Sequence, residues 1–449
     1  MSAKTSAKTL VTFDPNHPVL ARAAWSRLAE PTDAAVVALL SSLGAVEALD
    51  WLLHVALDAD GDVRTAPAPP PGSPQSARAS AAWAQAAARW APRLHGLEPE
   101  RDLEVLEHLG GSLVLPGDAW WPQGLDELEA PPVCLWVRGD PALLVSQAQA
   151  GQETDAPNVQ ELSSLPGELA HRFREQLVSA GPGCGHAVAL VGARAATSYG
   201  ERVAMELGAG LAAHGCVVVS GGAFGIDAAA HRGALSRGRT ISVSAGGVDR
   251  LYPAGNSRIL SQIAEEGALV AEVPPGCAPA RHRFLTRNRL IAAMTGATVV
   301  VEAAWRSGAL STAHHAQNLG RPLGAVPGPI TVMSSVGCHR LLRSGATCVT
   351  DAEEILELVT PLGAVDADRT KEAAQQARDP GLLDGLEPDC AAVLDALPAR
   401  GAAALERLAR VSGLGESQVG AALGLLELDG RVERDGTRWR RRRPATKAS

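Results

Sequence analysis

Residues 187–227 read AVALVGARAATSYGERVAMELGAGLAAHGCVVVSGGAFGID, and this stretch decides the fold. Two short apolar runs, 188–191 and 217–219, each end in a Gly-rich loop, and a helix is predicted between them over 198–213. The same alternation of apolar runs, loops and helices continues to residue 346. It predicts an α/β fold with a doubly wound, largely parallel sheet that helices cover on both faces.

The composition indicates a globular protein of several domains. The chain has 449 residues, of which 46% are hydrophobic, and domains average about 100 to 200 residues. With 4 Phe and 2 Tyr, its core must be built mainly from Ala, Leu and Val. A formal net charge of −8 argues against a uniformly basic surface, but it says little about a single groove.

Two features of the sequence indicate the cellular compartment of the protein. The 7 cysteines form no C-x-x-C pair, which favours buried thiols in a reducing cytosol over a disulfide framework. The first residues show no signal peptide, and apolar runs such as 297–301 are far shorter than the ~20 residues that span a bilayer. We therefore expect a cytoplasmic protein without a membrane anchor.

The chain divides into segments of different character. Apolar residues at helical spacing from position 19 to 91, interrupted by the proline-rich loop 67–74, predict a small helical domain over residues 1–100. The α/β core is expected over 101–364, with an irregular, partly disordered insertion near 147–185.

The remainder of the chain predicts a second domain type. Residues 365–382 are polar and Ala/Gln-rich, which is typical of a linker. Three short helices and a hairpin that turns at Asp435 and Gly436 then predict a winged helix-turn-helix domain over 383–443. A short tail, 444–449, follows.

Two loops of the predicted sheet have the character of anion-binding sites. The strand that ends in VGAR places backbone N–H groups and Arg194 at the carboxyl edge, where Ser198 and Glu201 suggest a capped helix. The loop SGGAFGID follows the next strand, and its glycines permit positive φ and close backbone approach to an anion. A tight structural turn would need the same glycines. Neither G-x-G-x-x-G nor a Walker A loop occurs, which disfavours NAD and NTP hydrolysis.

The segment RHRFLTRNR, residues 281–289, concentrates four arginines, one histidine and Phe284. Arginine suits bidentate phosphate contact, and a neighbouring ring can stack on an unpaired base. The alternative is an internal ion-pair hub with Glu272 and Glu302. We favour contact with nucleic acid.

Other residues attract chemical interpretations that we do not favour. Trp120, Trp121 and Trp136 could form a stacking platform, but a packed core corner is the better interpretation. His231, His314 and His315 lack metal-ligand spacing. Asp227 is more plausible as an acceptor for loop amides or an arginine than as a base. No Ser, His and Asp set stands out as a triad, so we expect no metal, no cofactor and no catalytic residue.

Six ordered blocks carry a resemblance to a known family: VGARAATSYG, SGGAFGIDAAAHRGAL, GGVDRLYPAGN, FLTRNRLIA, EAAWRSGALSTA and VPGPI. Together with LPGDAWWP and GATCV they resemble the DNA-processing protein A (DprA/Smf) family. The resemblance implies an extended Rossmann-like core, with a SAM-like helical domain before it and a winged-helix domain after it. It also implies single-stranded DNA binding, a homodimer, and help in loading the RecA recombinase onto incoming DNA in natural transformation.

The residues expected to contact DNA come from these blocks and from the two Gly-rich loops. Arg194 matches the family's basic position in its first loop, and Arg281 with Phe284 falls near a family pair for phosphate and base. Two positions depart from the family pattern: Phe224 stands where many relatives carry lysine, and His339 replaces an asparagine. The full expected set is Arg194, Ser198, Gly221, Gly222, Phe224, Arg281, Phe284, Arg287, Asn288, Arg289, Ser307 and Thr312.

Two rival functions belong to other classes. Related Rossmann-like phosphoribohydrolases release a base from a nucleoside monophosphate, but they need a P-G-G-x-G-T turn and a glutamate that this chain lacks near Thr312. A transcription factor would read duplex DNA with the winged domain, yet the expected recognition helix over 416–429 carries acids and no Arg or Lys.

Overall fold

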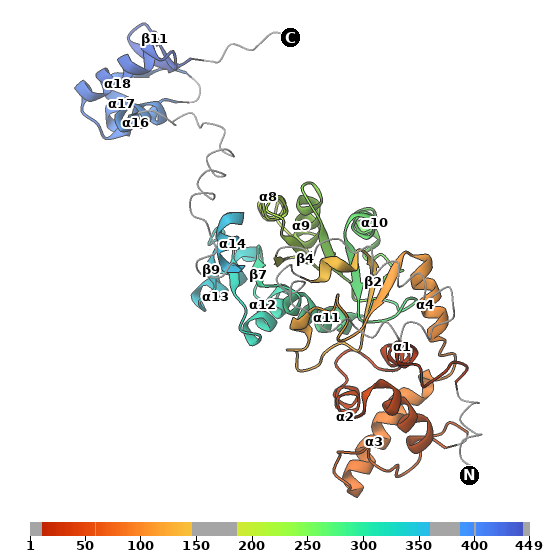
Figure 1. Cartoon of the computed structure of the whole chain (residues 1–449). Helices are drawn as coiled ribbons and strands as arrows, with labels where there is room; N and C mark the ends of the chain where they lie inside the picture. The colour runs from red at the N-terminus through yellow and green to blue at the C-terminus, as the bar shows by residue number, and fades with distance from the viewer. Residues whose placement is uncertain (1–10, 59, 146–185, 360–386, 399–400, 443–449) are drawn as a thin grey trace. The chain divides into compact units, whose positions relative to one another are not determined.

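The computed structural model describes residues 11–58, 60–145, 186–359, 387–398 and 401–442 (Figure 1). The expected insertion near 147–185, the linker 365–382 and the tail 444–449 lie outside the described residues. The chain forms two compact units, Met1–Ala364 and Val365–Ser449, and each is described by itself.

A nine-stranded sheet organises the first unit. Its strand order is β1-β2-β6-β5-β4-β3-β7-β8-β9. The six pairings from β6 to β9 are parallel, and the pairings of β1 with β2 and of β2 with β6 are antiparallel. The predicted doubly wound, largely parallel sheet is therefore confirmed. The strands are β1 Gly111–Val114, β2 Leu135–Gly139, β3 Ala187–Val191, β4 Val217–Ser220, β5 Thr240–Val243, β6 Ala268–Ala271, β7 Ala297–Val300, β8 Leu323–Ala325 and β9 Thr347–Cys348.

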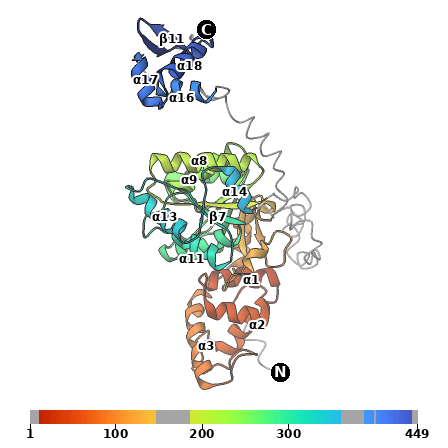
Figure 2. The same ribbon diagram turned by 90° about the vertical axis from the view of Figure 1, so that its left-hand side faces the viewer.

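Helices cover both faces of this sheet. Val188 and Leu190 of β3 pack with α8, α9 and α14, whereas Ala189 and Val191 pack with α11, α12 and α13. Figure 2 shows α8 and α9 on one side of the strands and α11 on the other. Since both faces of the central strands are buried, these strands consist mostly of apolar residues. The helices are α8 Ser198–Ala213, α9 Ile226–Leu235, α10 Ser257–Glu266, α11 Arg281–Ala293, α12 Ala309–Asn318, α13 Val336–Arg343 and α14 Ala352–Val359.

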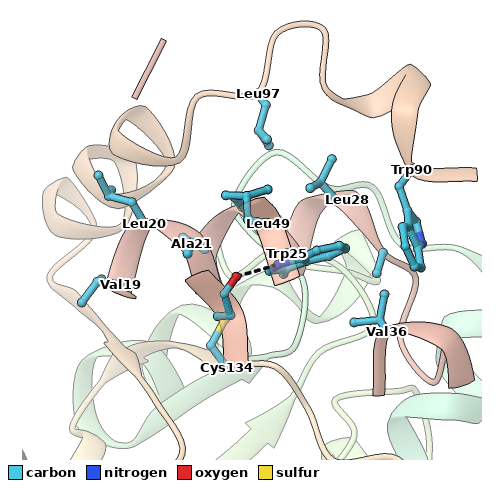
Figure 3. Packing of buried hydrophobic residues seen from close by; sticks show 14 of the residues in the cluster. Val19, Leu20, Ala21, Trp25, Leu28, Val36, Leu49, Trp90, Leu97 and Cys134 are labelled. Atoms are coloured by element: carbon cyan, nitrogen blue, oxygen red, sulfur yellow. Dashed lines mark hydrogen bonds between the residues drawn. The ribbon is translucent and has the colours of Figure 1, made fainter. Parts of the chain in front are cut away.

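The N-terminal part of the first unit is helical, as predicted. Trp25 lies fully buried at its centre, packs edge-on against Trp90 with ring centroids 5.2 Å apart, and donates to the carbonyl oxygen of Ala45 over 3.1 Å (Figure 3). Its elements are α1 Pro18–Leu28, α2 Ala34–Trp51, the π-helix Leu52–Ala56, α3 Ala77–Trp90 and α4 Pro99–His108, with a 3₁₀ turn at Ala91–Arg93. The α/β core contains further 3₁₀ turns at Gln123–Leu125, Pro141–Leu144, Ala254–Asn256 and Met333–Ser335.

One segment of this helical part, Ala34–Ala56, is long and apolar enough by length and composition to cross a membrane. It lies near the N-terminus, and 44% of its most apolar window is buried in the protein. Val36, Leu39 and Leu49 are among the buried side chains. Packing in the helical core therefore accounts for part of its hydropathy.

The second unit is a winged helix-turn-helix, as predicted. The three helices α16 Pro388–Ala396, α17 Leu405–Ser412 and α18 Glu416–Leu428 enclose a small apolar core around Val393, Leu408 and Leu423. A three-stranded sheet in the order β10-β12-β11 completes the unit, with β10 Ala403–Ala404, β11 Val432–Asp435 and β12 Arg438–Arg441.

Two local predictions can be compared directly. The prediction that Ser198 caps helix α8 is wrong: Thr197 is the N-cap, and its hydroxyl accepts from the N–H of Gly200 over 3.1 Å. The core interpretation of the tryptophans is confirmed, because Trp120, Trp121 and Trp136 are all buried.

Candidate nucleic-acid interface

A groove lies at the carboxyl edge of the sheet, where the strand order reverses direction. Strand β3 lies between β4 and β7, so the loops that follow these three strands meet at one place. Ligands in open α/β sheets bind at such switch points. The groove has a volume of about 570 Å³ and is lined by these loops, by helix α11 and by the start of α12.

Close contact between two loops sets the position of Arg194. Gly225 has a φ of +73°, and a Cβ there would collide with the carbonyl oxygens of Ala193 and Arg194. The N–H of Ile226 donates to the oxygen of Ala193 over 3.2 Å. The loop after β4 therefore supports the loop after β3, which holds Arg194 at the groove.

An aromatic cluster accompanies Arg194 at one rim. The Arg194 guanidinium carbon lies 5.0 Å from the centroid of the Phe284 ring, a cation–π geometry. The ring of Tyr252 lies 5.8 Å from that of Phe284. Phe224 is 49% exposed and Tyr252 is 54% exposed, in a chain with few such rings. This rim therefore offers a cation beside accessible ring faces.

A second cation and ring meet where Trp305, in the loop after β7, contacts Arg340 of helix α13. Trp305 is 52% exposed, and the Arg340 guanidinium carbon lies 5.2 Å from its ring centroid. Ala304 and Arg306, on either side of Trp305, line the groove. The sequence analysis missed Tyr252, Trp305, Arg306 and Arg340. The signal for three of them was present, since Tyr252, Trp305 and Arg306 lie inside quoted motifs.

Arg287 is buried beneath the Gly-rich loop that follows β4 and contains Gly221. Its Nη1 donates to the carbonyl oxygen of Val243, and a Cβ on Gly221 would collide with its guanidinium. Burial lowers the pKa of Arg287 to about 10, although the neighbouring Asp227 opposes this shift. Burial likewise raises the pKa of Asp227, and the Arg287 charge opposes the rise. The N–H of Ala223 donates to Asp227 over 3.3 Å, so this carboxylate accepts from the loop as predicted.

Two other arginines of RHRFLTRNR are engaged in ion pairs. Arg289 is buried and donates to both carboxylate oxygens of Glu272, over 2.6 and 2.8 Å. Arg283 makes the same bidentate contact with Glu30, over 2.8 Å for each bond. The internal ion-pair alternative, which named Glu272 and Glu302, therefore describes Arg289 but not Arg283, whose partner is Glu30.

The remaining polar residues of the set hold the loops around the groove. Asn288 donates to the carbonyl oxygen of Gly308 over 3.2 Å, Ser307 accepts from the N–H of Ala309 over 3.3 Å, and Thr312 is buried. All three line the groove. Ser198 is exposed at the start of α8, Arg281 is exposed at the start of α11, and Gly222 is buried with a φ of +73°.

Glu302 does not belong to the ion-pair hub that its sequence suggested. Its carboxylate is buried and accepts from the backbone N–H and the hydroxyl of Thr197, over 2.9 and 2.6 Å. The hydroxyl of Ser334 donates to it as well, over 3.2 Å. Glu302 therefore ties the loop after β3 to the loop before α13.

His231 and His339 have hydrogen-bond partners within the protein. His231 is fully buried, and its Nδ1 lies 2.8 Å from the hydroxyl of Thr240. Burial lowers the pKa of His231 to about 3, so the ring is neutral. His339 bonds the carbonyl oxygen of Gly328 over 2.9 Å. In the described part of the chain, no three His, Cys, Asp or Glu side chains gather as a metal site.

The groove thus combines exposed cations with apolar and aromatic surface. Arg194 and Arg306 are exposed, and Asp227, the acidic residue among those that line the groove, is buried under the loop. Such a site attracts a polyanion and can stack planar groups.

Two family models match this chain. The model described as DNA recombination-mediator protein A matches residues 182–360, and the DprA winged helix domain matches residues 373–436. A putative DNA processing protein DprA of Mycobacterium tuberculosis is 42% identical over 433 residues, which cover 93% of each chain. DNA processing protein DprA of Streptococcus pneumoniae is 40% identical over 170 residues, which cover 38% of this chain and 60% of that protein.

Solved structures of two such proteins are also similar to this chain. DNA processing protein A from Streptococcus pneumoniae aligns with a TM-score of 0.49 and 29% identity over 61% of this chain and 83% of that one. The protein of the same name from Helicobacter pylori, described with a single-stranded DNA binding mode, aligns with a TM-score of 0.43 and 27% identity, over 55% of this chain and 94% of that one.

Proposed function

Because this chain belongs to the DNA-processing protein A (DprA) family, we propose that the groove at the carboxyl edge of its sheet binds single-stranded DNA. One observation carries the proposal: Arg194 lies over Phe284, beside the exposed ring of Tyr252. A guanidinium suits a phosphate, and ring faces suit unpaired bases.

The aromatic rim favours a single strand over a duplex. In duplex DNA the bases are already stacked on one another, so exposed rings gain nothing from them without unstacking. Base–aromatic stacking contributes about 1–3 kcal/mol per base and tolerates any sequence. Binding should therefore be independent of sequence and sensitive to salt, because neutralised phosphates release counterions.

The DNA-contacting residues that we propose are Arg194, Phe224, Tyr252, Phe284 and Arg306. All are exposed or half-buried; Arg194, Phe284 and Arg306 line the groove, Tyr252 contacts Phe284, and Phe224 follows the groove residue Ala223 with its ring against Gly255. Arg281 is exposed one turn before Phe284 and completes the set. Four other residues of the expected set hold the loops around the groove and do not contact DNA themselves: Arg287, Asn288, Ser307 and Thr312. Gly221 leaves room for the Arg287 guanidinium.

We extend the proposal to the wider role that family membership supports. The protein protects incoming single-stranded DNA and helps load the RecA recombinase in natural transformation and recombination. It acts in the cytoplasm as a homodimer and catalyses no reaction of its own. The support is the family relationship over 93% of the chain.

The alternative, a nucleotide-binding enzyme of the phosphoribohydrolase type, is not favoured. Such an enzyme needs a carboxylate that can reach the sugar of a bound nucleotide. Asp227 is the acid that lines the groove, and it is buried and accepts from the Ala223 N–H.

The proposal is tested by fluorescence anisotropy with a labelled single-stranded oligonucleotide across a salt series. Arg194→Ala should weaken binding by about tenfold and reduce the slope of log K against log salt by about 0.7, the value for one lost contact on a single strand. Arg237→Ala is the matched control, because Arg237 is exposed in the loop before β5, at the opposite edge of the sheet. Equal affinities for the wild type and Arg194→Ala would contradict the proposal.

A further inference from the structure

The hairpin of the second unit has a strongly basic surface that the groove does not explain. Residues 431–442 contain six arginines and two acids, Glu433 and Asp435. Arg434, Arg438, Arg440 and Arg442 are exposed. Arg440 pairs with Glu433 over 2.8 Å, and Arg431 pairs with Asp429 over 2.6 Å. Within the described residues, Arg438 and Arg442 have no ion pair.

One face of the hairpin packs against the rest of the second unit, and the other face is exposed to solvent. Trp439 packs against the apolar core, with the Arg434 guanidinium carbon 5.7 Å from its ring centroid. Nη2 of Arg441 donates to the carbonyl oxygen of Leu394 over 2.6 Å. Because side chains alternate along a strand, Arg438, Arg440 and Arg442 lie on the opposite face.

Helix α18, which would be the recognition helix of a winged domain, offers no comparable surface. It carries Glu416 and Glu427 and no Arg or Lys. Gln418 is already engaged, since its oxygen accepts from the Gly415 N–H over 3.1 Å and its amide donates to Asp389 over 3.3 Å. The exposed residues Leu425 and Leu428 are apolar. This helix therefore lacks the cationic groups and the free amide that most often read base edges.

We propose that the hairpin β11–β12 is a second DNA-binding site, which holds the phosphate backbone of duplex DNA without reading its sequence. The hairpin, not α18, makes the contact through Arg438, Arg440 and Arg442. Trp439 is the one aromatic residue in 431–442, and it is half-buried against the core. The hairpin thus lacks the exposed rings that favour single strands at the groove, and a duplex, which presents phosphates at regular spacing, suits it better.

The test uses the full chain and a labelled blunt duplex, with anisotropy measured across a salt series. The double variant Arg438→Ala/Arg442→Ala should weaken duplex binding by at least about tenfold and reduce the log–log salt slope by about 2, which corresponds to two lost phosphate contacts. Its affinity for a single-stranded oligonucleotide should stay at the wild-type value. The matched control is Arg407→Ala/Arg410→Ala, which removes two exposed arginines from α17 of the same unit.

The inference is overturned if the double variant Arg438→Ala/Arg442→Ala binds the duplex with the affinity of the wild type. It is also overturned if the control variant Arg407→Ala/Arg410→Ala loses as much affinity for the duplex. The same holds if Arg438→Ala/Arg442→Ala loses as much affinity for the single strand as for the duplex. Arg194→Ala provides the reciprocal check, since it should retain duplex binding. Sequence-independent affinity is part of the expectation, so two duplexes of unrelated sequence should give the same result.

Discussion

Arg287 shows how burial changes the role of a residue in a basic motif. Its side chain is buried, donates to the carbonyl oxygen of Val243 and lies beside the buried Asp227. Burial lowers its pKa only to about 10, so the guanidinium stays charged at neutral pH. Its positive charge therefore stabilises the loop that carries Phe224 instead of meeting solvent.

Replacing Arg287 should destabilise the fold. Arg287→Ala removes the main cation beside the buried Asp227 carboxylate, and such losses cost about 3–5 kcal/mol. Urea unfolding at pH 7 measures this change. Arg281→Ala on the same helix, where the side chain is exposed, should stay within about 0.5 kcal/mol of the wild type. A fully stable Arg287→Ala protein that has lost only DNA binding would show instead that Arg287 touches the strand.

At the scale of elements, the first turn of α11 is held by a carboxylate from the helical part. Glu30 accepts from Arg283 over 2.8 Å, from His282 over 3.1 Å and from Arg93 over 2.9 Å. His282 and Arg283 directly precede Phe284 in the sequence, so this cluster fixes the turn that carries the Phe284 ring. The hydrogen bond from Arg283 is the main reason that the pKa of Glu30 falls from 4.5 to about 2, against the opposing effect of burial.

This lowered pKa predicts an acid-dependent stability. A carboxylate with a depressed pKa in the folded state contributes stability above its unfolded pKa of 4.5, and the contribution is lost as the pH falls towards 2. Glu30→Gln should cost about 1 kcal/mol at pH 7, since the pair is partly exposed, and should flatten the decline between pH 5 and pH 3. Urea unfolding over this pH range measures both effects. Glu98→Gln, which removes an exposed pair within one helix, is the control and should leave the profile unchanged.

The elements themselves were predictable because their patterns are local. The apolar runs of β3 and β4 and the helix between them were placed within one or two residues, since buried parallel strands and capped helices have short-range signatures. The antiparallel pairings of β1 and β2 were not foreseen. Pairing direction depends on contacts between segments far apart in the chain, such as Trp136 with Ala271.

The candidate site was predictable only in part, for the same reason. Four arginines in nine residues suggest a basic surface, and Glu272 was named only in the alternative that was not favoured. The sequence does not reveal that Arg283 meets Glu30, 253 positions away. Tyr252 and Trp305 were overlooked because the sequence of a motif does not show whether its aromatic side chain is exposed to solvent. Phe284 and Arg194 were identified, and their cation–π contact required the fold.

At the scale of the whole molecule, the chain carries two surfaces of different character. The groove of the first unit combines guanidinium groups with exposed rings, whereas the hairpin of the second unit has exposed guanidinium groups and a packed ring. On this difference rest both proposals, a single strand at the groove and a duplex at the hairpin.

The central claim, that a single strand lies on the aromatic rim of the groove, is tested most directly by photocross-linking. A single-stranded oligonucleotide that carries 5-iodouracil is irradiated with the full chain, and the adducts are located by mass spectrometry. Adducts on Phe224, Tyr252 or Phe284, and their loss in Arg194→Ala, are the predicted result. Adducts confined to the second unit, or unchanged in Arg194→Ala, would contradict the account.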